Sequence, residues 1–184
     1  WHDVDADERK RRAVQLYEEA GYSESNPLEV TIRYNTHDTH QKIAVAIQAM
    51  WRETLGVEAT LINEDFQVLL ANVQEGNTEV FRLNWNGDYN DAHTFLTNLE
   101  TGNSSNFTGY SSAEYDSLMA RAATQTDPAV RKLYLEEAER HMLRDYPLIP
   151  IYFRINRAMV STEVAGWGDN VLNYHYSQHL SFRP

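Results

Sequence analysis

The fold is decided by residues 28–62, LEVTIRYNTHDTHQKIAVAIQAMWRETLGVEATLI. Apolar and polar side chains alternate over residues 28–34, which predicts a strand with one covered face, close to an edge of its sheet. Apolar residues, Met50 among them, recur at helical spacing over residues 40–55, and Gly56 ends this pattern. Residues 57–62 then predict a second strand. A strand, a long helix and a strand joined by short loops predict a βαβ unit with parallel strands and a right-handed crossover.

The alternation of helices and strands continues on both sides of this unit. Residues 7–20 carry apolar side chains at helical spacing and acidic residues in the first turn, which predicts a helix. Residues 65–73 predict a short helix with Phe66, Leu69, Leu70 and Val73 facing inward, and residues 79–85 predict a third strand. The order β-α-β-α-β favours an α/β fold, and 184 residues are enough for one domain with a core of its own.

The second half of the chain is predicted to begin with helices and to end without clear periodicity. Residues 92–99 predict a short helix, and two longer helices follow, one capped by Ser112 and one started by Asp127-Pro128. We expect these two helices to pack as a hairpin, with Leu133 on the apolar stripe of the second. The apolar run Pro147–Ile155 predicts a buried strand, with an internal proline that indicates an edge or a bulge. From Ser161 onward we expect an extended tail with many aromatic side chains.

Composition excludes several classes of protein. The chain has 27 acidic and 16 basic residues, a net charge of −11, which disfavours binding to nucleic acid or to anionic lipid. It has no cysteine, so disulfides, thiol catalysis and zinc–thiolate sites are excluded. No apolar run reaches the roughly 18 residues of a membrane span. The start, Trp1-His2-Asp3, has neither an initiator Met nor a signal peptide, so we expect a piece of a longer protein, with a processed N-terminus as the alternative.

The stretch from Phe81 to Asp91, FRLNWNGDYND, is the candidate binding segment. It begins as an apolar strand, breaks at Gly87, and places a carboxylate, aromatic rings and amides in one short loop. Ligands of open α/β sheets bind at the carboxyl ends of the strands, where this loop is expected to lie. Taken alone, a Gly-Asp pair after a strand is also a common turn, in which the Asp only caps the backbone.

Several motifs resemble the C-terminal lobe of the bacterial extracytoplasmic oligopeptide- and dipeptide-binding proteins, family 5, which are the solute-binding subunits of peptide ABC importers. They stand in the family's order over roughly 150 residues. The motifs are Tyr34-Asn-Thr before His40-Gln-Lys-Ile-Ala-Val-Ala-Ile, Leu55-Gly-Val, Arg82-x-x-Trp85-x-x-Asp88-Tyr-Asn, Tyr110-x-Ser-x-Glu-Tyr-Asp-x-Leu-Met, and Tyr146-Pro-Leu-Ile-Pro-Ile-Tyr-Phe.

The resemblance implies one lobe of a type II periplasmic-binding-protein fold, with a mixed sheet flanked by helices. Residues 1–184 would form a single α/β lobe of a two-lobed protein whose ligand is enclosed between the lobes. The tail, residues 161–184, would cross toward the missing first lobe. This chain would therefore hold half of a binding cleft.

The resemblance also implies roles for individual residues. Asp88 stands where the family places the carboxylate that pairs with the α-ammonium group of a peptide. Asn84, Trp85 and Asn86 match the segment that hydrogen-bonds to the peptide backbone, which reads peptide shape and not side chains. The alternatives that remain open are a turn-capping role for Asp88 and a core position for Trp85.

Two arginines complete the predicted binding residues. Arg82 stands where relatives can hold the ligand or its ordered waters, and a structural ion pair with a carboxylate is the alternative. Arg154 stands where some relatives have an aromatic residue, so it is a candidate ligand contact, and an ordinary surface arginine is its alternative.

Rival chemistry has weaker support. Two groups, His37-Asp38-x-His40 and Asp88-x-x-Asp91-x-His93, contain residue types that bind zinc or nickel, but both fall at predicted helix starts, where such residues act as caps. No G-x-S-x-G, H-E-x-x-H or phosphate-binding glycine loop occurs. We therefore expect no metal, no cofactor and no enzymatic activity, with a metal-dependent hydrolase as the remote alternative.

The resemblance thus implies a monomeric, non-catalytic protein that captures short peptides and passes them to the membrane permease of an ABC importer. The acidic composition disfavours nucleic acid as a partner. The expected location is periplasmic or extracytoplasmic, and a lipoprotein anchor on a preceding segment stays open. The alternative function within the family is a different cargo, such as a nickel chelate, haem or an oligosaccharide, because fold similarity does not fix the ligand.

Overall fold

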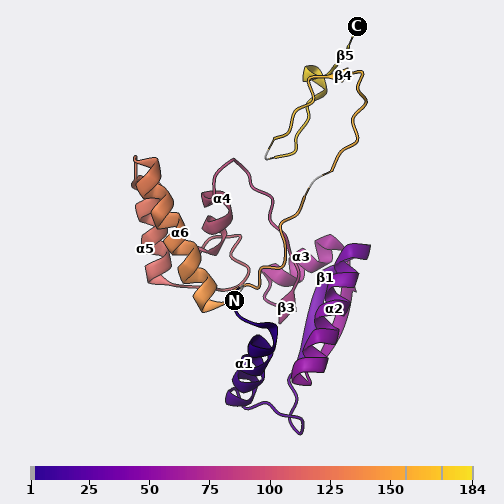
Figure 1. The fold of residues 1–184 in the computed structure, drawn as a ribbon, viewed down its shortest axis with the longest axis vertical. Helices are drawn as coiled ribbons and strands as arrows, with labels where there is room; N and C mark the ends of the chain where they lie inside the picture. Colours follow the sequence, from indigo (N-terminus) through magenta and orange to yellow (C-terminus); the bar gives the residue numbers. More distant parts are fainter. Residues whose placement is uncertain (1–2, 156, 171, 184) are drawn as a thin grey trace. The chain divides into compact units, whose positions relative to one another are not determined.

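The computed structural model describes residues 3–155, 157–170 and 172–183 (Figure 1). These residues form two compact units, and the division falls between Asn84 and Trp85. The first unit contains α1 (Ala6–Glu19), β1 (Glu29–Asn35), α2 (Asp38–Leu55), β2 (Glu58–Glu64), α3 (Phe66–Gln74) and β3 (Val80–Phe81). The second contains α4 (His93–Leu96), the 3₁₀ turn η1 (Thr97–Leu99), α5 (Ala113–Thr124), α6 (Pro128–Asp145), β4 (Val164–Ala165), η2 (Ser177–His179) and β5 (Ser181–Phe182).

The first unit is built on a parallel three-stranded sheet with the order β2-β1-β3. β1 pairs with β2 along its whole length, from Glu29 beside Glu58 to Asn35 beside Glu64. The predicted βαβ unit and its parallel strands are therefore confirmed. The predicted edge position of β1 was wrong, because β3 covers its other side.

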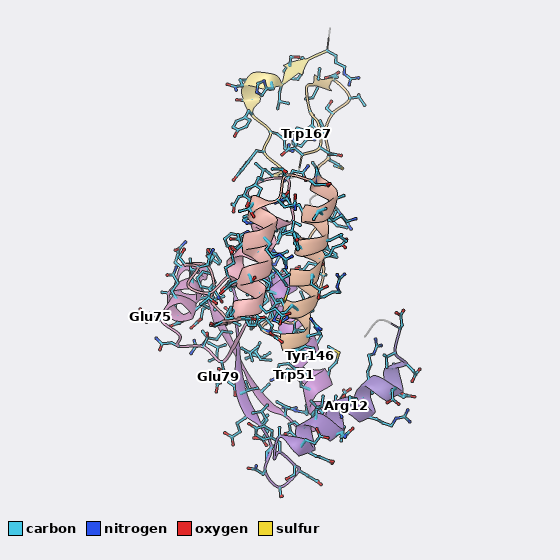
Figure 2. The ribbon with its side chains drawn as sticks, turned by 90° about the vertical axis from the view of Figure 1, so that its left-hand side faces the viewer. Arg12, Trp51, Glu75, Glu79, Tyr146 and Trp167 are labelled. Atoms are coloured by element: carbon cyan, nitrogen blue, oxygen red, sulfur yellow. The ribbon has the colours of Figure 1, made fainter. Side chains whose placement is uncertain are left out.

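Helix α2 packs its apolar face against the sheet. Ile32 and Tyr34 of β1 and Ala59 of β2 form a buried cluster with Ala44 of α2, and Trp51 packs against the same cluster (Figure 2 labels Trp51). The sequence pattern had also placed Met50 on this face, and it is exposed in the structure. Met50 lies one position outside the stripe, so a Met there needs no core contact.

Local signals explain where the helices begin and end. Asp65 caps α3 by accepting a hydrogen bond from the Gln67 N–H at 2.9 Å, and Asp127 caps α6 in the same way. Helix α2 ends at Gly56, which has the left-handed backbone conformation, φ 74°, that a helix C-terminus favours. Leu69 and Val73 of α3 are buried as predicted, whereas the predicted inward position of Phe66 is exposed.

The second unit has a core between its helices. Helices α5 and α6 run side by side in both views (Figures 1 and 2), and the predicted helix hairpin is confirmed. Tyr115 and Met119 of α5 are fully buried against Ala138 of α6 and Leu96 of α4. The predicted inward position of Leu133 was wrong, because Leu133 is exposed and Leu135, two positions further along the helix, is buried instead.

Two predicted strands are not present as predicted. β3 contains only Val80–Phe81, and residues 82–87 have no regular secondary structure. The described residues of the predicted strand Pro147–Ile155 have no strand conformation, and most of their apolar side chains are exposed, with Phe153 at 98%. A strand needs a partner for its main-chain groups, and nothing in the part of the second unit that the structure describes pairs with this run.

The tail is less extended than expected. β4 and β5 pair antiparallel, with Val164 beside Phe182 and Ala165 beside Ser181. Trp167 stacks on His175 with ring centroids 3.6 Å apart (Figure 2 labels Trp167). The α/β class with a parallel sheet flanked by helices is thus confirmed, and this short antiparallel pair forms a separate sheet. None of the helices within the described residues is long and apolar enough to cross a membrane.

Candidate functional site

The candidate stretch begins where β3 ends. The Arg82 N–H donates to the Arg33 carbonyl at 2.9 Å, which is the last ladder contact between β3 and β1. From Leu83 to Gly87 the main-chain groups make no hydrogen bond to another described residue. The prediction that the strand extends to Trp85 was wrong, because the main-chain N–H and C=O groups of this segment are not paired in a sheet.

At the end of the first unit, Arg82 and Asn84 are linked. Arg82 Nη1 donates to Asn84 Oδ1 at 3.0 Å and lies 3.5 Å from Nδ1 of His40 in α2. The His40 ring stacks on His37, with centroids 4.5 Å apart, and His37 Nδ1 caps α2 by accepting from the Thr39 N–H. A guanidinium, an amide and two imidazoles therefore gather at the start of α2.

In the second unit, Asp88 is exposed and its carboxylate is oriented by one side chain. Thr94 Oγ1 donates a hydrogen bond to Asp88 Oδ2 at 3.3 Å. Thr94 Oγ1 also accepts a hydrogen bond from the Asp88 N–H at 3.0 Å. Asp88 Oδ1 accepts no hydrogen bond from the residues that the structure describes. The carboxylate is therefore fixed at one oxygen and open at the other.

Gly87 holds the loop close to α4. A Cβ atom at this position would lie 3.0 Å from Phe95 Cζ and 3.1 Å from Thr94 Cγ2. Such distances are shorter than ordinary side-chain contacts, so the loop reaches this position because residue 87 has no side chain.

The far end of the loop is anchored to α6. Arg131 forms two hydrogen bonds with Asp91, Nη1 to Oδ2 at 2.7 Å and Nη2 to Oδ1 at 2.9 Å. Asp91 Oδ1 also accepts from the His93 N–H at 2.8 Å, next to the start of α4. The hydrogen bonds from Arg131 hold the pKa of Asp91 below its usual value, against the opposing effect of burial. Two parallel bonds to a guanidinium are the strongest arrangement for such a pair.

The remaining predicted residues differ in what the structure says of them. Trp85 is 41% exposed and belongs to neither of the buried clusters formed by the described residues. Asn86 is exposed on the same irregular segment. Arg154 lies on the exposed run after α6, and no hydrogen bond within the second unit's described residues joins it to Asp88.

The groups suggested as metal ligands have other contacts. Asp91 binds Arg131, and His93 Nδ1 lies 2.7 Å from the Tyr89 hydroxyl. No three His, Asp or Glu side chains are arranged around a common point in the parts of the chain with described coordinates.

One cluster elsewhere combines a hydroxyl, an imidazole and carboxylates. Ser112 Oγ lies 2.9 Å from His141 Nε2, and His141 Nδ1 lies 3.8 Å from Glu114. The same Ser112 oxygen accepts the Tyr115 N–H at 3.3 Å as the cap of α5, and Tyr110 binds Asp145 at 2.6 Å beside it. These contacts join the start of α5 to the end of α6, which is a structural role.

Sequence reasoning missed Thr94, Arg131 and the contact with His40. A threonine in the first turn of a short helix is read as a cap, and Arg131 lies 40 residues from Asp91 in the chain. The signal for Arg131 was that Asp91, an acidic loop residue, needs a basic partner. Sequence spacing alone does not identify which arginine or lysine that partner is.

The profile of the family "Bacterial extracellular solute-binding proteins, family 5 Middle" matches residues 1–107. That is more than half of the 184 residues. The chain belongs to family 5 of the bacterial extracellular solute-binding proteins. The resemblance drawn from the sequence motifs is therefore confirmed.

Three curated proteins are similar to this chain. The chain is 32% identical over 181 residues to the periplasmic oligopeptide-binding protein OppA of Escherichia coli, covering 98% of this chain and 33% of that protein. It is 34% identical over 164 residues to the periplasmic murein peptide-binding protein MppA of E. coli, covering 89% and 30%. It is 33% identical over 174 residues to the probable deoxycholate-binding periplasmic protein YgiS of E. coli, covering 94% and 32%.

The solved structures agree with this membership. The Haemophilus influenzae OppA complex with the peptide RPPGFSPFR superposes with a TM-score of 0.91 at 31% identity, over 98% of this chain and 36% of that one. The E. coli MppA structure gives a TM-score of 0.89 at 31% identity, over 98% and 36%. The chain spans about a third of the length of the curated relatives that it matches.

Proposed function

We propose that this chain is one lobe of a protein that binds short peptides for ABC-type import. The observation that carries the proposal lies within the second unit: an open main-chain segment, residues 85–87, is followed by the exposed carboxylate of Asp88, which has one free oxygen. A peptide has matching groups in the same order. Its backbone would pair with the open segment, and its α-ammonium group would donate to Asp88 Oδ1.

The energetics favour an ammonium as the partner of Asp88. An ammonium enclosed in a cleft loses its hydration and needs a charged acceptor, and charge-assisted hydrogen bonds are about twice as strong as neutral ones. Backbone pairing adds affinity without selecting side chains. In this arrangement Trp85, which is exposed, forms a wall against a peptide side chain, and Asn84, Asn86, Arg82 and Arg154 are further candidate contacts.

The names of the relatives support peptide cargo. The relatives include oligopeptide-binding and murein-peptide-binding proteins, and one solved relative holds a nine-residue peptide. With this cargo we infer a non-catalytic, monomeric protein that delivers peptides to a membrane permease. Its location would be the periplasm or another extracytoplasmic space, either free or held by a lipid anchor.

The proposal includes a second lobe outside this chain. The ligand would be enclosed when the two lobes close about a hinge, driven by contacts that exist only in the closed state. The exposed apolar run around Phe153 and the tail from Ser161 are then the segments that meet the first lobe. A continuous exposed apolar run is uncommon unless another surface covers it.

A second cargo is favoured by one observation. YgiS, a relative as similar as the peptide binders, is described as a probable deoxycholate-binding protein. A bile acid has a carboxylate and no ammonium group, so it has no reason to pair with Asp88.

Calorimetric titration of the full-length protein and its Asp88→Ala variant separates the two cargoes. For tri-alanine we expect Asp88→Ala to weaken binding about 100-fold, because a desolvated ammonium loses its charged partner. Deoxycholate binding that is unchanged by Asp88→Ala, with no binding of tri-alanine to either protein, would establish the second cargo and reject the first.

A further inference from the structure

Thr94 is a polar side chain in an unusual place. It is 0% exposed, although threonine is mostly found at protein surfaces. A buried hydroxyl without hydrogen bonds is costly, so the partners of this hydroxyl indicate why it is tolerated.

Both hydrogen-bonding roles of the Thr94 hydroxyl go to Asp88. Thr94 Oγ1 accepts from the Asp88 N–H at 3.0 Å and donates to Asp88 Oδ2 at 3.3 Å. The hydroxyl has one proton, and that proton points to the carboxylate. The backbone and the side chain of residue 88 are therefore both held by one buried group.

The position of Thr94 is itself fixed from two sides. Its methyl group packs against Gly87, where a Cβ would lie 3.1 Å from Thr94 Cγ2. Just before α4, Asp91 is clamped by Arg131 and accepts from the His93 N–H. Neither the helix that carries Thr94 nor the loop that carries Asp88 can shift without breaking these contacts.

We propose that Thr94 is the positioning residue that orients the Asp88 carboxylate toward the ligand. By holding Oδ2, the Thr94 hydroxyl leaves Oδ1 as the oxygen that receives the ligand ammonium group. This role rests on the proposed function, in which Asp88 binds the ammonium group of a peptide. It adds the group that restricts Asp88 to one rotamer before the ligand arrives, which reduces the entropy lost on binding.

The test uses the full-length protein and two ligands, tri-alanine and N-acetyl-tri-alanine. Thr94→Val removes the hydroxyl and keeps the shape of the side chain, whereas Thr94→Ser keeps the hydroxyl and removes the methyl group. We expect Thr94→Val to weaken tri-alanine about tenfold, the effect of one hydrogen bond, and to leave N-acetyl-tri-alanine unchanged. We expect Thr94→Ser to keep the preference for the free amine, because it keeps the hydroxyl, and to lose less tri-alanine affinity than Thr94→Val does.

A merely structural role gives a different pattern. The proposal is wrong if Thr94→Val lowers the affinity for both ligands equally. It is also wrong if Thr94→Ser lowers the affinity for tri-alanine as much as Thr94→Val does. Thr94→Ala removes the same hydroxyl without adding a methyl group, so it must give the same ligand selectivity if Thr94→Val does not fold. Melting temperatures of all variants separate lost stability from lost affinity.

A double-variant cycle separates this inference from the proposed function. If Thr94 acts through Asp88, Thr94→Val has no further effect on tri-alanine in an Asp88→Asn background. A wild type that binds tri-alanine and its acetylated form equally overturns the proposed function, and this inference with it. A tri-alanine affinity that depends on Asp88 but not on Thr94 overturns the inference alone.

Discussion

At the residue scale, Gly87 is restricted by a close contact with α4. Replacement by alanine would place a Cβ 3.0 Å from Phe95 Cζ and 3.1 Å from Thr94 Cγ2. We expect Gly87→Ala to destabilise the protein by about 1 kcal/mol, as mild overpacking does, and to weaken tri-alanine binding by moving Asp88.

The Gly87→Ala prediction is checked by thermal unfolding and by titration of the same sample. Gly168→Ala is the matched control, because a Cβ at Gly168 meets no atom within 4 Å. Equal melting temperatures for the two variants would contradict the account of Gly87.

The pair of Asp91 and Arg131 predicts a dependence of stability on pH. Arg131 lowers the pKa of Asp91 in the folded state, so the pair stabilises the fold above the unfolded pKa of about 3.9. This stabilisation is lost as the pH falls through the lower, folded pKa. We expect Asp91→Asn to lower the free energy of unfolding at pH 7 and to have a smaller effect at pH values below the folded pKa of Asp91.

Urea unfolding at several pH values measures this effect. Arg131→Gln removes the other partner of the ion pair. It should also reduce the change of the free energy of unfolding with pH in the acid range. If Asp91→Asn lowers the free energy of unfolding by the same amount at low and at neutral pH, the ion pair is not the cause of the lost stability.

Sequence could predict part of the site at this scale. The ligand-binding role of Asp88 stays a prediction, which rests on the Gly-Asp pair after an apolar strand and on the family motif that includes it. Thr94 could not be found, because its role depends on a contact across a tight loop that leaves no periodic pattern. The exposure of Trp85 was likewise undecided, since an aromatic residue after a strand suits both a core and a binding surface.

At the scale of elements, the junction between α2 and β2 depends on Gly56. Its φ of 74° is unfavourable for residues with a Cβ, and its N–H bonds to the Arg52 carbonyl at 3.0 Å. We expect Gly56→Ala to cost about 1 kcal/mol of stability. Chemical denaturation measures the loss, and peptide affinity per folded molecule should not change.

A contrary result at Gly56 would be informative about the βαβ unit. Stability equal to wild type would mean that the tight connection between α2 and β2 does not need the left-handed conformation. Val57 is buried directly after this turn, so a longer connection would displace a core residue.

Periodicity predicted the helices and the parallel order well, and it predicted the short strands poorly. Each long helix has an apolar stripe and a cap, which are local signals. β3 ends at Phe81 although the apolar pattern continues. Its pairing with β1 ends at Arg33 beside Phe81, and the sequence pattern does not show where such pairing stops. The apolar run 147–155 looks like a buried strand, but burial requires a surface to pack on, and the sequence does not say which surface that is.

The whole molecule, on our proposal, is about three times as long as this chain, judged from the length of the relatives. Half of the cleft then lies elsewhere, so we expect the isolated chain to bind tri-alanine without saturation at concentrations on the order of 1 mM. Titration of the isolated chain checks this. Micromolar affinity of the chain alone would contradict the two-lobed account.

The central claim is that an ammonium group at Asp88 holds the ligand. Its most direct test is a calorimetric titration of the full-length protein and its Asp88→Asn variant with tri-alanine and N-acetyl-tri-alanine. The account predicts that the wild type prefers the free amine by about 100-fold and that Asp88→Asn abolishes this preference. Equal affinity of the wild type for both ligands, or a preference that survives Asp88→Asn, would contradict it.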